Sequence, residues 1–148
     1  MGLLTAQRLD AEVMFYGLWM QDIGASFDDE PAADTPFGSS DGARLVIHSA
    51  GHTHTADLRA EVRDEEPPAA PGEWDVSADA RIDAPEGRLR LWTYAAVSKE
   101  DIHLGRPGRT WNVRVRVRGR DEVFALAQHD VPEGVECYLV QFWPVTES

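Results

Sequence analysis

The chain has 148 residues and a formal net charge of −12 at pH 7, with 43% hydrophobic and 27% charged residues. This length predicts one globular domain, because it can bury a single hydrophobic core and is short for two. The negative charge disfavours binding to DNA, RNA or an anionic membrane, whose phosphates attract basic surfaces, and no apolar stretch approaches the roughly 18 to 20 residues of a membrane span.

Cysteine use and the N-terminal sequence predict a cytoplasmic location. Cys137 is the single cysteine and has no partner for an internal disulfide, which suits a reducing compartment. The first twenty residues lack the basic segment, unbroken apolar run and small-residue cleavage site of a secretory signal. We therefore expect a cytoplasmic protein.

Most of the chain alternates between apolar and polar residues with a period of two, as strands with one buried face do. Residues 24–42, rich in Asp, Ala, Pro, Gly and Ser, predict a mobile acidic loop, and the three prolines of residues 65–72 predict a connection outside any sheet. A helical turn between residues 121 and 134 would be short. In chain order, the expected strands cover residues 12–20, 43–49, 54–65, 74–83, 89–97, 112–118 and 136–144.

About seven short strands, with turns between them and no long amphipathic helix, predict an all-β fold. The expected architecture is a single-domain antiparallel β-sandwich of jelly-roll type that spans residues 1–148, with little helix. Both sheets of such a sandwich turn their apolar faces inward.

Arginines occupy every second position of the expected strand at 112–118, between valines that predict its buried face. Like charges in such a row need acids on the neighbouring strand, since directly opposite unlike charges stabilise a sheet and like charges destabilise it. We therefore expect a lattice of ion pairs on a solvent-exposed face. An anion clamp is the alternative, because arginine binds phosphates and carboxylates bidentately. The expected lattice joins Arg114, Arg116 and Arg118 to Asp75, Asp79 and Asp83, or failing these to Asp57 and Glu61.

A histidine-rich stretch offers a candidate metal site. On a strand, His52 and His54 would lie on one face and could place two imidazoles on one ion, with Asp57 as a third ligand. This His-x-His element resembles that of the cupin family, which would imply a metal-dependent enzyme or sensor. That family has a glutamate four or five positions after the second histidine, where this chain has Leu58 and Arg59. A polar turn between strands is the alternative interpretation.

No motif for nucleophilic or cofactor chemistry is present. The sequence has no G-x-S-x-G, P-loop, C-x-x-C or dinucleotide-binding pattern. Cys137 falls inside an apolar strand, where a small buried residue is expected rather than an activated thiolate. We therefore expect a protein without a cofactor and favour a non-enzymatic role, while enzymatic activity stays an open alternative.

The C-terminal third carries two motifs, "VRVRVRGRDE" at 113–122 and "ECYLVQFWP" at 136–144. They resemble the ending of a group of small bacterial proteins of unassigned function that occur in high-GC Gram-positive species. The general layout of the chain also resembles the competence nuclease inhibitor family, whose members are acidic β-sandwich proteins that block a partner nuclease. That resemblance implies a protein partner.

Together the charge and the acid clusters favour a binding module that docks a basic protein, as an immunity or inhibitor protein for a toxin or nuclease would. Two alternatives stay open: the cupin-like metal protein, and a structural or assembly subunit that uses exposed aromatic residues as its interface. The residues expected to contact the partner are Asp28, Asp29, Glu30, Asp34, Asp64, Glu65 and Glu66.

Overall fold

The computed structural model describes residues 2–25, 38–68, 72–93 and 97–145. These residues form ten strands and one short helix, so the all-β class is confirmed, with more strands than the seven expected. The elements are β1 (Leu3–Met14), β2 (Gly17–Asp22), β3 (Ser39–Asp41), β4 (Arg44–His48), β5 (Thr53–Arg63), β6 (Val76–Ala84), β7 (Arg88–Trp92), β8 (Val97–His103), β9 (Arg109–Arg118), α1 (Arg120–Leu126) and β10 (Glu133–Pro144).

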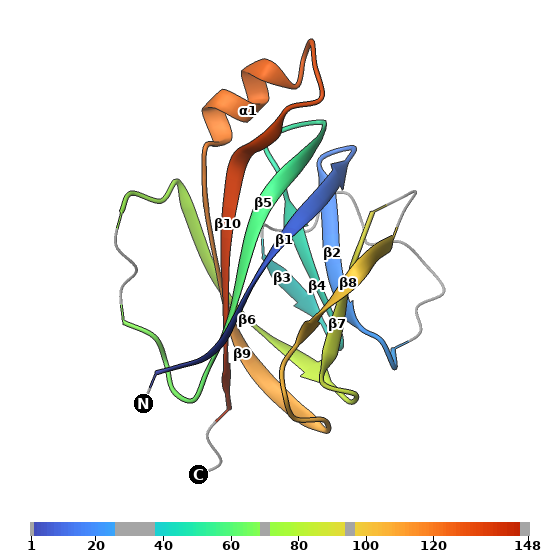
Figure 1. The fold of residues 1–148 in the computed structure, drawn as a ribbon, viewed down its shortest axis with the longest axis vertical. Helices are drawn as coiled ribbons and strands as arrows, with labels where there is room; N and C mark the ends of the chain where they lie inside the picture. Colours follow the sequence, from blue (N-terminus) through green and yellow to red (C-terminus); the bar gives the residue numbers. More distant parts are fainter. Residues whose placement is uncertain (1, 26–37, 69–71, 94–96, 146–148) are drawn as a thin grey trace.

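The strands form one strongly curved mixed sheet (Figure 1). Its order is β3-β4-β2-β1-β5-β10-β9-β6, and the β7–β8 hairpin branches from β2. All pairs are antiparallel except β5 with β10. The two ends of the path approach each other, and the Asp83 amide on β6 donates to the Gly42 carbonyl beside β3 at 3.0 Å. The sheet therefore nearly closes on itself, where two separate antiparallel sheets were expected.

The hydrophobic core fills the inside of this curved sheet. Val113, Val115 and Val117 on β9 are fully buried, as the alternation predicted, and the arginines between them lie on the outer face. Fully burying an aliphatic side chain of this size contributes about 1.5 to 3 kcal/mol. The inner faces of β5 and β10 add Leu58 and Phe142, which are also fully buried. Burial of these alternating positions holds the sheet in its register.

The expected strand at 12–20 is in fact two strands joined by a tight turn. Met14 on β1 pairs with Gly17 on β2, so Phe15 and Tyr16 are the two turn residues. Both have positive φ, 51° and 63°, which is the conformation of a two-residue hairpin turn that normally selects Asn and Gly. Because apolar residues continue through this turn, the turn was not predicted from the sequence.

Relieving the strain of this turn should stabilise the protein. Non-glycine residues in the left-handed region cost roughly 1 to 2 kcal/mol each, and Asn and Gly adopt it more easily. The double substitution Phe15→Asn and Tyr16→Gly is therefore expected to raise the unfolding free energy by about 1 kcal/mol in urea denaturation. Val131→Asn, at another exposed apolar residue, is the control and should change it by less than about 0.5 kcal/mol. A double variant no more stable than the wild type would contradict the conclusion that this turn is strained.

The connections differ from expectation in two places and agree with it in two others. Part of the expected acidic loop at 24–42 is strand β3, while residues 26–37 lie outside the described residues. The expected strand at 89–97 ends at Trp92, and β8 begins at Val97. The short helical turn expected after β9 is α1, which buries Val123 alone. The Pro-rich segment at 65–72 connects β5 to β6, as expected, and its residues 69–71 are not described.

Candidate functional site

The arginine strand forms one of the three expected acidic pairings. Arg114 lies opposite Asp79, and its Nε and Nη2 donate to that carboxylate at 2.8 and 3.2 Å. Nη2 also donates to Glu66 at 3.0 Å. Hydrogen bonds from Arg114 hold the pKa of Asp79 below its usual range, and those to Asp79 and Glu66 raise the pKa of Arg114.

The other members of the expected lattice have different partners. Arg116 lies opposite Ser77, and the Arg118 guanidinium lies over the Trp74 ring, 5.3 Å from its centroid. Asp75 accepts a hydrogen bond from the Arg120 backbone amide at 3.0 Å. Asp83 accepts one from the Thr110 hydroxyl at 2.8 Å.

The second-choice acids are paired on β5 rather than with β9. Asp57 lies 3.2 Å from Arg8. Glu61 accepts hydrogen bonds from Arg59 at 2.9 Å and from Arg63 at 3.1 Å. Arg8 therefore joins β1 to β5, whereas Arg59 and Arg63 pair with Glu61 along β5 itself.

The structure separates the three expected metal ligands. His52 is exposed in the bend before β5, with its ring 4.9 Å from Phe15 and 5.1 Å from Tyr16. His54 is buried on the inner face of β5, while Asp57 lies on the outer face. Among the residues that the structure describes, no group of three or more His, Cys, Asp or Glu side chains could hold a metal ion. The predicted set fails to converge because β5 begins after His52, and because Asp57 lies three positions after His54, which turns the two side chains to opposite faces of the strand.

His54 belongs instead to a buried polar cluster formed with Ser49, Glu136 and Tyr138. The Ser49 hydroxyl and the Tyr138 hydroxyl each donate to Glu136 Oε1 at 2.6 Å, and the Ala50 amide donates to Oε2 at 3.1 Å. The His54 Nε2 atom lies 2.7 Å from Ser49 Oγ. The side chains of His54 and Glu136 are fully buried.

The hydrogen bonds of the buried polar cluster indicate which ring nitrogen of His54 carries the proton. A carboxylate at Glu136 only accepts hydrogen bonds, so the single hydroxyl protons of Ser49 and Tyr138 are both donated to it. Nε2 of His54 must then donate to Ser49 Oγ, which leaves Nδ1 as a lone pair; within the described residues this buried atom has no hydrogen-bond partner. Burial lowers the pKa of His54 despite the attraction of Glu136. It also raises the pKa of Tyr138.

The buried polar cluster contains Ser, His and Glu, yet its geometry does not suit nucleophilic catalysis. The Ser49 hydroxyl points at the carboxylate, whereas a nucleophilic serine donates to the histidine. Ser49 is 5% exposed. The cluster therefore joins the end of β4 to β5 and β10, and its role is structural.

This cluster should make stability depend on pH. Because the pKa of His54 is lowered in the folded protein, the unfolded chain binds a proton near pH 6.5 that the folded chain does not bind. Stability is then fully present above that pH and is lost as the pH falls below it. The urea midpoint should fall between about pH 7 and pH 5, and His54→Gln should remove that slope. The carboxyls with lowered pKa, Glu61, Asp79 and Asp101, titrate below this window. An equal slope in the variant would assign the dependence to another group.

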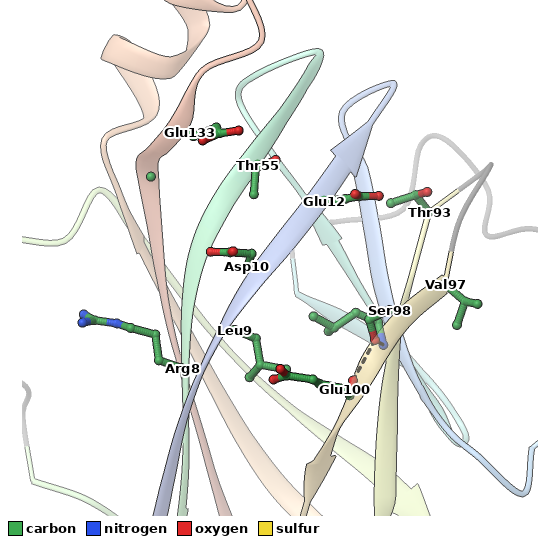
Figure 2. Close-up of a pocket in the computed structure, with 12 residues that line it drawn as sticks. Arg8, Leu9, Asp10, Glu12, Thr55, Thr93, Val97, Ser98, Glu100 and Glu133 are labelled. Carbon is green, nitrogen blue, oxygen red and sulfur yellow. Dashed lines mark hydrogen bonds between the residues drawn. The ribbon is translucent and has the colours of Figure 1, made fainter.

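An acidic groove of about 580 Å³ runs along β1 and is also lined by residues of β5, the β7–β8 hairpin and β10 (Figure 2). Gln7 of β1 fixes β8 there, because its side chain donates to the Asp101 carbonyl at 3.0 Å and accepts from the His103 amide at 2.8 Å. Its acids are Asp10 and Glu12 on β1, Glu100 on β8 and Glu133 on β10 (Figure 2). The groove is lined by Arg8, Leu9, Asp10, Glu12, Thr55, Leu91, Thr93, Val97, Ser98, Glu100, Glu133 and Gly134.

The acidic groove holds negative charge that the described side chains do not neutralise. Asp10, Glu12, Glu100 and Glu133 make no ion pair with any described side chain, and Arg8 is engaged with Asp57. Asp10 also lies directly opposite Asp57 on β5, a like-charge arrangement that costs sheet stability. The chain therefore tolerates unfavourable charge here.

The acids predicted from the sequence lie elsewhere. Asp64, Glu65 and Glu66 line a larger pocket, of about 1060 Å³, near the end of β5 and the start of β9. That pocket also contains Arg106 and Arg109. This pocket therefore holds two arginines beside its acids, whereas the described arginine of the acidic groove, Arg8, is paired with Asp57. The predicted residues Asp28, Asp29, Glu30 and Asp34 lie outside the described residues.

None of the four acids of the groove was predicted as a contact from the sequence. A signal existed for two, since Asp10 and Glu12 alternate with Leu9 and Ala11, which are buried on β1. Nothing local marks Glu100 or Glu133, because the pairing of distant strands brings them to the same surface.

Comparisons with known proteins identify the fold. No known family model matches the chain, and no curated protein matches its sequence. A solved structure described as "Crocagin biosynthetic gene J" has a TM-score of 0.70 and 15% identity, covering 96% of this chain and 98% of that one. ComJ from Bacillus subtilis, an inhibitor of the DNA-degrading activity of NucA, has a TM-score of 0.65 and 10% identity, covering 98% and 99%.

These likenesses support the expected resemblance to competence nuclease inhibitors at the level of the fold. They extend over nearly the whole of each chain. Among the described residues, no helix is long and apolar enough to cross a membrane.

Proposed function

We propose that the protein is a non-enzymatic inhibitor or immunity protein that docks a basic protein partner, such as a nuclease or another toxin. The acidic groove carries this proposal, because it gathers four carboxylates on a concave surface where the one described arginine of the lining, Arg8, is engaged with Asp57. A surface of this kind attracts a basic partner and accelerates its association. The net charge of −12 adds to the attraction.

The shared fold supports the same function. ComJ inhibits a nuclease, and an inhibitor needs a binding surface rather than a catalytic centre. In the described part of this chain, the cluster of Ser49, His54 and Glu136 is closed to solvent. We place the contact at the acidic groove in preference to Asp64, Glu65 and Glu66, because arginines line their pocket and Glu66 pairs with Arg114.

Capture from the native host tests this function. Immobilised protein is expected to retain a basic protein at low salt and to release it as the salt concentration rises, because salt screens the attraction. The released protein is then assayed for nuclease or other toxic activity with increasing amounts of the chain. Inhibition that saturates at a fixed stoichiometry supports the proposal. A chain that retains nothing at low salt, or a partner whose activity is unchanged, would contradict it.

A further inference from the structure

One end of the molecule carries exposed apolar side chains on two neighbouring structures. The tip of the β1–β2 hairpin and α1 with the segment after it lie at the same end in Figure 1. These side chains are 41 to 64% exposed. We call this surface the apolar end and define it as Phe15, Tyr16, Phe124, Leu126 and Val131.

The loop before β5 joins the two halves of the apolar end. The Tyr16 amide donates to the His52 carbonyl at 2.8 Å, and the rings of Phe15 and Tyr16 lie edge-on to the His52 ring. On the other side, a Cβ built at Gly51 would lie 3.0 Å from Val123 of α1. The hairpin tip, this loop and α1 are therefore packed side by side.

The hairpin tip is held in an unfavourable conformation. Phe15 and Tyr16 both have positive φ, although bulky residues avoid that region and hairpins select Asn and Gly there. Strain of this kind concentrates at functional sites. Aromatic side chains held out into solvent supply large, rigid contact areas of the kind that dominate binding energy in protein interfaces.

The charges around the apolar end indicate which kind of protein would bind there. Three exposed acids lie on α1 or just after it: Asp121, Glu122 and Asp130. Two exposed acids of the acidic groove, Glu12 and Glu133, lie close in sequence to the apolar residues Phe15 and Val131. A second copy of this chain would bring the same acids against one another. A protein whose apolar patch is surrounded by basic residues would complement both the centre and the rim.

We infer that the apolar end is the centre of the interface with the basic partner, with Phe15 and Tyr16 as anchoring side chains and the acidic groove as its charged flank. This inference rests on the proposed function and adds the part of the surface that supplies most of the affinity. The rim charges mainly set the association rate, whereas buried aromatic anchors set the dissociation rate.

Photo-crosslinking in the native host tests the inference. The crosslinking residue p-benzoylphenylalanine replaces Phe15 or Phe124 in the apolar end, Glu100 in the acidic groove, or Leu4, which is 59% exposed at the other end of β1. Mass spectrometry identifies the adducts. Phe15 and Phe124 should give an adduct with the same basic protein, and Leu4 should not.

The purified partner provides the second measurement. The variant Phe124→Ser with Leu126→Ser should weaken binding by about tenfold or more, while the matched variant Leu3→Ser with Leu4→Ser should leave it unchanged. Thermal unfolding checks that both variants fold. Adducts at Glu100 alone, or equal affinities for the two variants, would overturn the inference and leave the proposed function standing. Adducts with a second copy of this chain would also overturn it. No adduct at any position would contradict both.

Discussion

The Glu136→Gln variant is expected to lose about 3 kcal/mol of unfolding free energy. Glu136 is fully buried, and both of its oxygens accept hydrogen bonds, Oε1 from Ser49 and Tyr138 and Oε2 from the Ala50 amide. The glutamine amide has one oxygen and one NH2 group. In one orientation its NH2 group faces the Ala50 amide, a donor against a donor; in the other it faces the Ser49 and Tyr138 hydroxyls, which must then turn their protons away. In both orientations the Arg120 guanidinium 3.9 Å away loses its counter-charge.

Urea denaturation at neutral pH measures this loss. Glu133→Gln is the matched control, because it makes the same chemical change on the same strand at an exposed side chain, where substitutions change stability by about 0.5 kcal/mol or less. A Glu136→Gln variant as stable as the wild type would mean that the buried polar cluster does not depend on a carboxylate at this position. The hydrogen-bond assignment of His54, which rests on that carboxylate, would then lose its support.

The parts of the fold that follow from local alternation could be predicted from the sequence. A strand turns successive side chains to opposite faces, so the valines of β9 identify the core without knowledge of any neighbour. The same reasoning places the arginines outside. Alternation does not give the register between strands, however, and in the register of β6 with β9 only Asp79 of the three expected aspartates lies opposite an arginine.

Two other features could not be predicted for different physical reasons. The β1–β2 turn is formed by Phe15 and Tyr16, whose side chains disfavour the backbone conformation that the turn requires. The acidic groove and the buried polar cluster depend on pairings between distant segments, such as Ser49 with Glu136, 87 positions apart. No local pattern records such contacts.

Neutralising the acidic groove is expected to slow association with the basic partner by about tenfold or more at low salt, with little change in dissociation. The variant Asp10→Asn, Glu12→Gln and Glu100→Gln removes three charges without changing side-chain size. Asp10, Glu12 and Glu100 make no ion pair with described side chains, so the folded state should not suffer. Surface plasmon resonance over a range of salt concentrations measures both rates.

The matched control is Asp64→Asn, Glu65→Gln and Glu73→Gln, which removes the same number of charges from exposed residues outside the groove. If net charge alone attracts the partner, both variants slow association equally, and the groove has no special role. If the groove directs the encounter, the first variant is slower at low salt. This difference must shrink towards 1 M salt, where the screening length falls to about 3 Å. An unchanged association rate in the groove variant would leave the like-charge contact between Asp10 and Asp57 without a functional reason.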